Sequence, residues 1–348
     1  MFMYALSAMP GSVSTISNRE LRLAARPRGL PGPNVWELTD EEVPEPATGE
    51  MLVKISHISL DPAMRGWMDD VRSYIRPVAL GEVMRAPAVG RVIASRHPGF
   101  AEGSWVTGLF GVRQYALSDG QGVRIVDPHL APLPRYLGAL GITGLTAYFG
   151  MLDIGRPRPG ETVVVSGAAG AVGSIAGQIG RLLGARTVGI AGGGEKCQWL
   201  TDVLGFEEAV DYKLGNVRRA LRGAAPDGID VYFDNVGGRL LDDALAVLGV
   251  GGRIILCGAI SQYNTGERVQ GPANYLSLLV NRASMTGLIV FDYEDRYDEA
   301  TDQLLAWLDA GALIAREHVV RGEIDAFPQL LLDLFAGAST GKLVLELV

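Results

Sequence analysis

Cysteine and histidine are scarce in this chain. Among 348 residues there are two cysteines, Cys197 and Cys257. Two cysteines cannot build a disulfide framework, and a chain of this length does not need one, so we expect a reducing compartment, the cytoplasm. The four histidines are scattered at His57, His97, His129 and His318. No C-x-x-C or H-E-x-x-H spacing occurs, and zinc sites need such ligands at defined places, so we expect no metal.

Long apolar runs and a basic charge balance are also absent. No stretch of about 18 apolar residues predicts a transmembrane helix. The first residues lack the basic region of a secretory signal peptide. The formal net charge is -8, whereas nucleic-acid-binding surfaces are usually basic. We therefore expect neither a membrane nor a nucleic acid as partner, and the absence of G-x-S-x-G leaves hydrolysis unsupported.

The length favours two domains, and the character of the sequence changes near residue 140. Residues 1–15 are predicted to be a disordered leader. Over 16–140, short apolar runs alternate with glycine and proline turns, which predicts an all-β, barrel-like domain. Residues 141–305 are predicted to form a nucleotide-binding domain, and 306–348 to return to the first domain through a final strand at 341–348.

Strands and helices alternate through the second region. After an apolar helical stretch at 137–152, the predicted elements are strands at 161–166, 186–191, 229–234 and 253–257 and helices at 171–183, 196–204 and 240–248. Strands that alternate with helices of this length predict an α/β fold with a parallel, doubly wound Rossmann sheet. A further helix is expected from Tyr297 to Asp309.

A glycine-rich turn separates the first of these strands from its helix. The sequence from 166 to 173 is Ser-Gly-Ala-Ala-Gly-Ala-Val-Gly. A dinucleotide pyrophosphate needs backbone N–H groups at a helix N-terminus and no side chains where it approaches. We predict that it binds to Ala169, Gly170, Ala171, Val172 and Gly173. Ala168 stands where G-x-G-x-x-G has its first glycine, so a tight turn without a ligand is the alternative.

The end of the second strand distinguishes the two dinucleotides. An NAD site usually carries a carboxylate there for the ribose 2′-hydroxyl. This chain instead has Gly192-Gly-Gly-Glu-Lys196, in which Glu195 is expected to point outward. The glycines leave room for a 2′-phosphate and Lys196 supplies a positive charge, so we predict NADP. The alternative for Lys196 is a solvated surface lysine.

The predicted absence of a metal also bears on the chemistry. Enzymatic oxidation of an alcohol usually relies on a metal ion to polarise the substrate oxygen. Hydride addition to a conjugated double bond can proceed without one, because hydrogen bonds stabilise the developing enolate and one donor is worth roughly 3 kcal/mol.

Several segments resemble the zinc-independent branch of the medium-chain dehydrogenase/reductase superfamily, with its prostaglandin reductases, leukotriene B4 dehydrogenases and double-bond (2-alkenal) reductases. The similar segments are Leu60-Asp-Pro-Ala-Met-Arg-Gly66, Gly81-Glu-Val-Met84, Gly141-Ile-Thr-Gly-Leu-Thr-Ala-Tyr148, the turn at 166–173, Tyr232-Phe-Asp-Asn-Val-Gly-Gly238 and Cys257-Gly-Ala-Ile-Ser-Gln-Tyr-Asn264. Zinc-dependent members carry Gly-His-Glu near the second of these segments, and this chain does not. The resemblance implies a GroES-like barrel beside the Rossmann domain, and a homodimer formed through the sheet edge of the nucleotide domain.

The resemblance also implies roles for individual residues. Lys196 and Tyr212 would hold the 2′-phosphate, and Asn235 the ribose or pyrophosphate. Around the nicotinamide the resemblance places Cys257, Gly258, Ile260, Tyr263 and Phe291. Tyr263 would be catalytic and would donate a hydrogen bond to the enolate oxygen; the alternative is a tyrosine that only packs against the cofactor.

Two departures affect the predicted site. The family often has tyrosine in Asp-Pro-Tyr-Met-Arg, where this chain has Ala63. Tyr74 is predicted to take over its substrate contact, or else is a surface-loop residue. Near the C-terminus the family often has asparagine before a hydrophobic residue and Gly-Lys. Here Ser339 stands in that place, as the predicted cofactor contact.

We therefore predict an NADPH-dependent reductase of the C=C bond of α,β-unsaturated aldehydes and ketones. Hydride goes to the β-carbon, the enolate is held by hydrogen bonds, and Ala63, Tyr74 and Tyr263 bind the enone or enal. The alternatives are an NADPH quinone oxidoreductase and a non-catalytic NADPH-binding interaction protein. Loops 60–80 and 262–275 are expected to determine the substrate.

Overall fold

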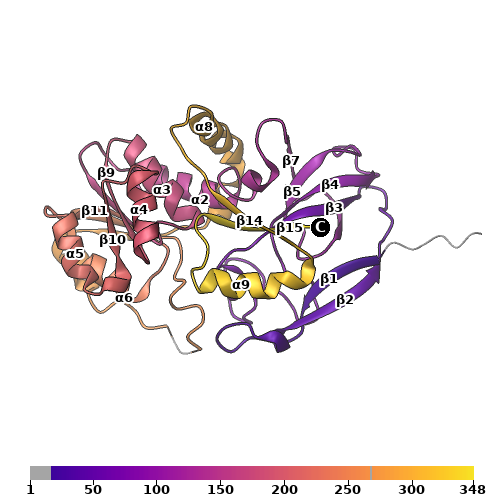
Figure 1. Cartoon of the computed structure of the whole chain (residues 1–348), viewed down its shortest axis with the longest axis horizontal. Coiled ribbons are helices and arrows are strands. Elements are labelled where there is room, and N and C mark those ends of the chain that lie inside the picture. The colour runs from indigo at the N-terminus through magenta and orange to yellow at the C-terminus, as the bar shows by residue number, and fades with distance from the viewer. Residues whose placement is uncertain (1–16, 267–268) are drawn as a thin grey trace, which may run out of the picture.

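Two large sheets and a two-stranded ribbon organise the chain (Figure 1). The structure is a computed structural model, and it describes residues 17–266 and 269–348. The predicted leader, residues 1–15, lies outside the described residues. None of the helices in the two described stretches is long and apolar enough to cross a membrane.

The unit that carries most of the helices is built on a parallel sheet. Its strands are β8 (Thr162–Ser166), β9 (Arg186–Ala191), β10 (Glu208–Asp211), β11 (Ile229–Asp234), β12 (Leu248–Leu256) and β13 (Ser284–Gly287). Their order is β10-β9-β8-β11-β12-β13, and every neighbouring pair is parallel. The order reverses between β8 and β11, which is where ligands bind in open α/β sheets.

Helices cover both faces of this sheet. They are α2 (Ile142–Phe149), α3 (Ala171–Leu182), α4 (Gly194–Asp202), α5 (Val217–Ala224), α6 (Gly238–Leu245), α7 (Leu276–Asn281) and α8 (Tyr297–Asp309). Side chains alternate along β8: Val163 and Val165 enter the core that also holds α3, whereas Val164 enters the core under α5 and α6. Burial on both faces explains why this strand is a continuous apolar run.

The second unit contains both ends of the described chain and is built on the other large sheet. It holds β3 (Met51–Ser59), β4 (Ala88–Ser95), β5 (Trp105–Gly108), β6 (Tyr115–Ser118), β7 (Arg124–Val126), β14 (Glu317–Gly322) and β15 (Lys342–Leu347). The ribbon β1 (Ser17–Leu23) and β2 (Trp36–Glu42) and the helices α1 (Met64–Trp67) and α9 (Phe327–Phe335) belong to this unit. β15 pairs antiparallel with β3, so the final strand lies in the sheet of the N-terminal unit. The predicted α/β fold, with a parallel Rossmann sheet and a separate N-terminal sheet, is confirmed.

Some element bounds differ from the prediction. The helix expected over 137–152 is confined to α2 and is followed by a π-helical turn, Gly150–Gly155. A Cβ on Gly144 would lie 1.8 Å from the oxygen of Ala139, because the chain folds back on itself before α2. The predicted helix 240–248 ends at Leu245, since Leu248 is buried and already pairs with Ile229 in the sheet. The domain boundaries at 140 and 305 stay a prediction.

A short segment before β15 connects the two units. The N–H of Gly341 donates to Ala169 of the glycine-rich turn at 2.9 Å. A Cβ on Gly341, which has a φ of +76°, would lie 2.1 Å from a backbone oxygen, so the crossing requires glycine. The next side chain, Lys342, is buried and donates to Leu60 O at 2.8 Å and to Asp61 Oδ1 at 2.5 Å. The last strand therefore joins the turn of one unit to the segment of the other that carries Ala63.

Candidate active site

The glycine-rich turn joins β8 to α3 at the carboxyl edge of the parallel sheet. A Cβ on Gly173 would lie 2.4 Å from the oxygen of Gly167, so the helix can pack on the turn only with glycine there. Gly170 caps α3 without a side chain, and among the described residues its Cβ would meet just the Gly167 oxygen, at 3.2 Å. The predicted residues Ala169 to Gly173 thus present a bare turn and the N-terminus of a 12-residue helix, which fits a pyrophosphate.

Beside this turn, the carboxyl end of β9 combines small residues with two cations. A Cβ on Gly192 would lie 2.7 Å from the Tyr212 ring and hydroxyl, so the phenol lies directly against that glycine. Burial, and then the charge of Lys213, lower the pKa of the Lys196 ammonium. A phosphate near both ammonium groups would relieve their repulsion. Tyr212 therefore lies against Gly192, Lys196 and Lys213 are at the same end of β9, and Glu195 is exposed.

Lys196 is already engaged by the segment that precedes β15. Its Nζ donates to Gly337 O and to Ser339 O, both at 2.8 Å. The ammonium is thus half-buried between α4 and the C-terminal segment, which contradicts the alternative of a solvated surface lysine. Ser339 takes part through its backbone oxygen. An ammonium has three donors, so one N–H of Lys196 stays available for a phosphate oxygen.

Asn235 lies at the point where the strand order reverses, directly after β11. Its Nδ2 donates to Ser166 O at 2.7 Å and its N–H to Ser166 Oγ at 2.9 Å. Ser166 Oγ in turn donates to Asp234 Oδ1 at 2.8 Å. Burial raises the pKa of the Asp234 carboxyl, against hydrogen bonds that lower it. These bonds hold the ends of β8 and β11 together and leave Asn235 Oδ1 as the atom available to a ribose hydroxyl.

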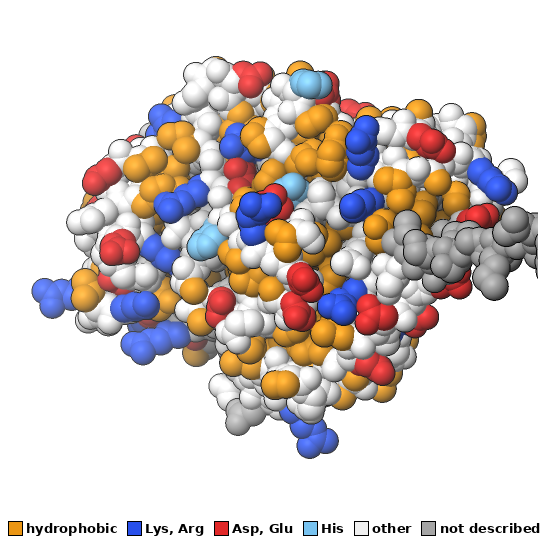
Figure 2. Space-filling view, turned by 45° about the vertical axis from the view of Figure 1, so that its right-hand side comes forward, with side chains coloured by type: hydrophobic (Ala, Val, Ile, Leu, Met, Phe, Trp, Pro, Cys, Tyr) orange, Lys and Arg blue, Asp and Glu red, His pale blue; other side chains and the backbone are white. Residues whose placement is uncertain are grey.

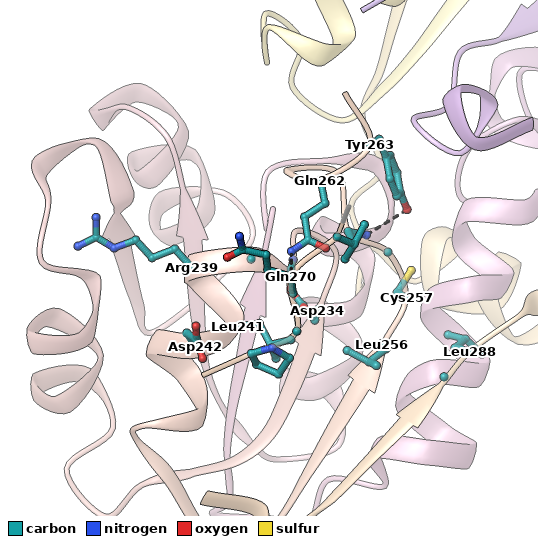
Figure 3. Close-up of a pocket in the computed structure, with 18 of the residues that line it drawn as sticks. Asp234, Arg239, Leu241, Asp242, Leu256, Cys257, Gln262, Tyr263, Gln270 and Leu288 are labelled. Atoms are coloured by element: carbon teal, nitrogen blue, oxygen red, sulfur yellow. Dashed lines mark hydrogen bonds between the residues drawn. The ribbon is translucent and has the colours of Figure 1, made fainter. Parts of the chain in front are cut away.

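The loop that comes after β12 forms one wall of a cavity of about 620 Å³ (Figure 3). The N–H groups of Gly258 and Ile260 already donate to the oxygens of Asp234 and Asn235, so a cofactor can reach only the carbonyls of these two residues. Burial raises the pKa of the Cys257 thiol to about 12, and the thiol stays neutral. The cavity is lined by Asp234, Gly237, Gly238, Arg239, Leu241, Asp242, Leu256, Cys257, Gly258, Ala259, Gln262, Tyr263, Val269, Gln270, Gly271, Pro272, Gly287, Leu288 and Ile289.

Tyr263 lies at one end of this cavity, where Figure 3 shows its hydroxyl meeting a backbone N–H. The donor is Ala259 N, at 3.0 Å from Tyr263 Oη. Since the phenol oxygen accepts in this bond, its own proton is left to donate elsewhere. Burial raises the pKa of this phenol, so it keeps the proton well into the alkaline range.

The N-terminal unit contributes Tyr74, from an irregular stretch that follows α1. Its ring centroid lies 6.2 Å from that of Phe291, in the turn Val290–Arg296 of the other unit. Burial raises the pKa of the Tyr74 phenol, as it does for Tyr263. Tyr74 and Phe291 therefore meet where the two units face each other, and we call this place, next to the cavity that Cys257 and Tyr263 line, the cleft. Ala63 precedes α1 and packs on the core of the N-terminal sheet.

Three contributors to the site were missed by sequence reasoning. Lys213 follows Tyr212, and its place after a strand end was the available signal. Asp211 accepts from Gly193 N and Lys213 N, both at 2.9 Å, and so fixes the glycine loop. Trp67 donates to Tyr74, which no sequence pattern indicates because the contact depends on an irregular loop.

The described residues contain no group of three or more His, Cys, Asp or Glu side chains placed to hold a metal ion. Cys197 and Cys257 are both unpaired thiols.

Comparison with known families and proteins agrees with this geometry. The family described as "N-terminal domain of oxidoreductase" matches residues 19–126, and the one described as "Zinc-binding dehydrogenase" matches residues 171–307. The NADPH-dependent curcumin reductase of Escherichia coli is 40% identical over 94% of this chain and 96% of its own length. The NADP(+)-dependent 2-alkenal reductase of Nicotiana tabacum is 37% identical over 94% and 97%.

A solved structure shows the same arrangement of both units. CurA from Vibrio vulnificus, in complex with NADPH, has a TM-score of 0.90 and 43% identity to this chain. The similarity covers 95% of this chain and 99% of that one.

Proposed function

The chain belongs to the zinc-independent branch of the medium-chain dehydrogenase/reductase family, and on that premise we propose that it reduces the C=C bond of α,β-unsaturated aldehydes and ketones with NADPH. The observation that carries the proposal is the Tyr263 phenol. Its oxygen accepts from Ala259 N at 3.0 Å, and its proton is left for a substrate oxygen.

The end of the site at β9, where the ribose 2′-phosphate would bind, fits NADPH. Tyr212 packs against Gly192, Gly193 faces open space, and Lys196 and Lys213 supply the positive charge. Asp211, at the end of the neighbouring strand β10, accepts hydrogen bonds from two backbone N–H groups, those of Gly193 and Lys213. The curcumin and alkenal reductases, by name, and CurA, by its complex, use or bind the same cofactor.

Bound NADPH supplies a hydride to the β-carbon of the substrate. Negative charge then develops on the carbonyl oxygen, and Tyr263 donates to it a hydrogen bond that strengthens as the charge grows. Asn235 Oδ1 and the carbonyls of Gly258 and Ile260 orient the cofactor. Phe291 and Tyr74 would contact the substrate from opposite units, and Ala63 would leave space for the remainder of the enone. The proton for the α-carbon comes from solvent or a relay.

A panel assay tests this function against its alternatives. NADPH absorbance is followed with 2-alkenals, aryl enones and quinones. We expect oxidation of NADPH with at least one class of enone. Turnover of quinones alone would instead support a quinone oxidoreductase, and binding of NADPH without turnover of any compound would support a non-catalytic protein.

The charge and the edges of the molecule suggest how it associates. On the face drawn in Figure 2, acidic and basic side chains are mixed over the N-terminal unit, which supports a small molecule and not a nucleic acid as partner. β13 is the outer strand of the parallel sheet, and the helix before it exposes Leu276, Leu279 and Val280. We propose a homodimer through this edge, acting in the cytoplasm.

Light scattering tests the dimer. We expect twice the chain mass for the wild type and one chain mass for Leu279→Glu/Val280→Glu, because two charges would enter an apolar contact. Those side chains are 74% and 69% exposed in the single chain. The matched control is Leu130→Glu, at an exposed leucine of the N-terminal unit, which should stay dimeric. A monomeric wild type contradicts the proposal.

A further inference from the structure

The hydrogen bond between Trp67 and Tyr74 defines how the second phenol of the cleft can act. Trp67 Nε1 lies 2.9 Å from Tyr74 Oη. We infer that Trp67 is a positioning residue that aims the Tyr74 proton into the cleft, which makes Tyr74 a second donor to the substrate oxygen beside Tyr263. This inference rests on the proposed enone reduction and names a determinant of it.

The direction of this hydrogen bond follows from the chemistry of the Trp67 indole and the Tyr74 phenol. An indole N–H can only donate. Tyr74 Oη is therefore the acceptor, and its own proton must point away from Trp67. Among the described residues, no acceptor lies within hydrogen-bond distance of that proton. The same logic holds for Tyr263, whose oxygen accepts from Ala259 N. Each phenol thus accepts one N–H from the protein and keeps one proton to donate.

Trp67 is held rigidly, whereas Tyr74 is not. The indole is 5% exposed and packs in the core of the N-terminal sheet. The backbone of Trp67 ends α1 and accepts from Val78 N at 2.8 Å. The guanidinium of Arg85 lies over the ring face, 5.8 Å from its centroid, and a cation there strengthens the N–H as a donor. Tyr74, by contrast, is 49% exposed in a stretch without regular structure.

The position of Tyr74 suits a donor to the same oxygen. Its ring centroid lies 6.2 Å from that of Phe291, which belongs to the other unit, and burial raises the pKa of the Tyr74 phenol, so it keeps its proton. Ala63, directly before α1, has no hydroxyl to offer. The pair Trp67–Tyr74 therefore provides, from the next loop, the second donor that Ala63 cannot provide.

An enolate mimic tests the inference without turnover. The protein is saturated with NADP+ and titrated with 4-nitrophenol, whose anion is coloured and places a phenolate oxygen before the two donors. We expect Tyr74→Phe to weaken binding of the anion roughly tenfold, and Trp67→Phe about fivefold, since a hydrogen bond to a charged group is lost or misdirected. The double variant should bind no more weakly than Tyr74→Phe alone, because Trp67 acts through Tyr74.

Two further variants serve as controls. Trp307→Phe, at an indole of α8, should leave binding unchanged. Trp67→His retains a ring N–H and should recover part of the affinity, which also covers the case in which Trp67→Phe fails to fold. Thermal unfolding and NADP+ affinity are measured for every variant.

The outcomes separate this inference from the proposed function. An effect of Trp67→Phe that persists in the Tyr74→Phe background, no effect of Trp67→Phe, or no binding of the anion by the wild type overturns the inference. Reduction of enones by the wild type is scored independently, so turnover without Trp67–Tyr74 coupling rejects this inference alone. Coupling without any enone turnover rejects the proposed function alone.

Discussion

Tyr263→Phe is expected to lower kcat for enone reduction about 100-fold, the usual effect of removing one oxyanion donor. Tyr263 Oη accepts from Ala259 N, which leaves its proton to donate. In the proposed function it donates to the substrate oxygen, where negative charge appears as hydride arrives. The contact strengthens in the transition state, and KM should therefore change far less than kcat. Steady-state kinetics with a 2-alkenal or aryl enone measures both constants.

The control for this variant is Tyr275→Phe, which removes the hydroxyl of an exposed tyrosine next to α7 and should leave kcat unchanged. NADPH affinity, measured by fluorescence, should be the same in both variants. If Tyr263→Phe raised the NADPH dissociation constant and left kcat intact, the alternative of a tyrosine that only packs against the cofactor would be correct. Because burial raises the pKa of Tyr263, the wild-type kcat should persist well into the alkaline range before the donor proton is lost.

Lys196→Ala is expected to weaken NADPH binding roughly 10- to 100-fold, the value of one hydrogen bond between charged groups, with little change for NADH. Lys196 lies beside Tyr212 and Lys213 at the end of β9, and only NADPH carries a 2′-phosphate for it to contact. Titration of the variant with NADPH and with NADH gives the ratio of the two dissociation constants. An equal loss for NADPH and NADH would contradict the assignment.

The comparison of two cofactors in one variant is needed because Lys196 also holds Gly337 O and Ser339 O. Loosening that segment would affect both cofactors alike, through its contact with the glycine-rich turn. Lys213→Ala is the companion variant. It removes the neighbouring cation and should weaken NADPH binding less than Lys196→Ala does. Among the described residues, Lys213 makes no bond to the C-terminal segment.

The fold was largely predictable because the central strands of the parallel sheet are buried on both faces. The valine run of β8 and the small residues that start α3 define the strand, turn and helix without tertiary information, and helix α8 has the predicted bounds, Tyr297 to Asp309. Helix ends were less predictable where the chain folds back on itself, as at Gly144, since the limiting contact there is with a backbone oxygen outside the helix.

The candidate site was predictable where one segment carries the chemistry, as in the turn at 166–173, and through the family resemblance for Tyr212 and Tyr263. It was not predictable where distant segments meet. The bond of Lys196 to residues more than 140 positions away, and the bond of Trp67 to Tyr74, depend on the crossing before β15 and on an irregular loop. No local pattern encodes either.

The central claim is hydride transfer to a carbon–carbon double bond, and the position of a label tests it most directly. The protein is supplied with NADPH that carries deuterium at the transferred position and with an α,β-unsaturated ketone, and the product is examined by NMR. The proposed function predicts a saturated ketone with deuterium on the β-carbon. An allylic alcohol with deuterium on the former carbonyl carbon, or unchanged ketone and NADPH, would contradict it.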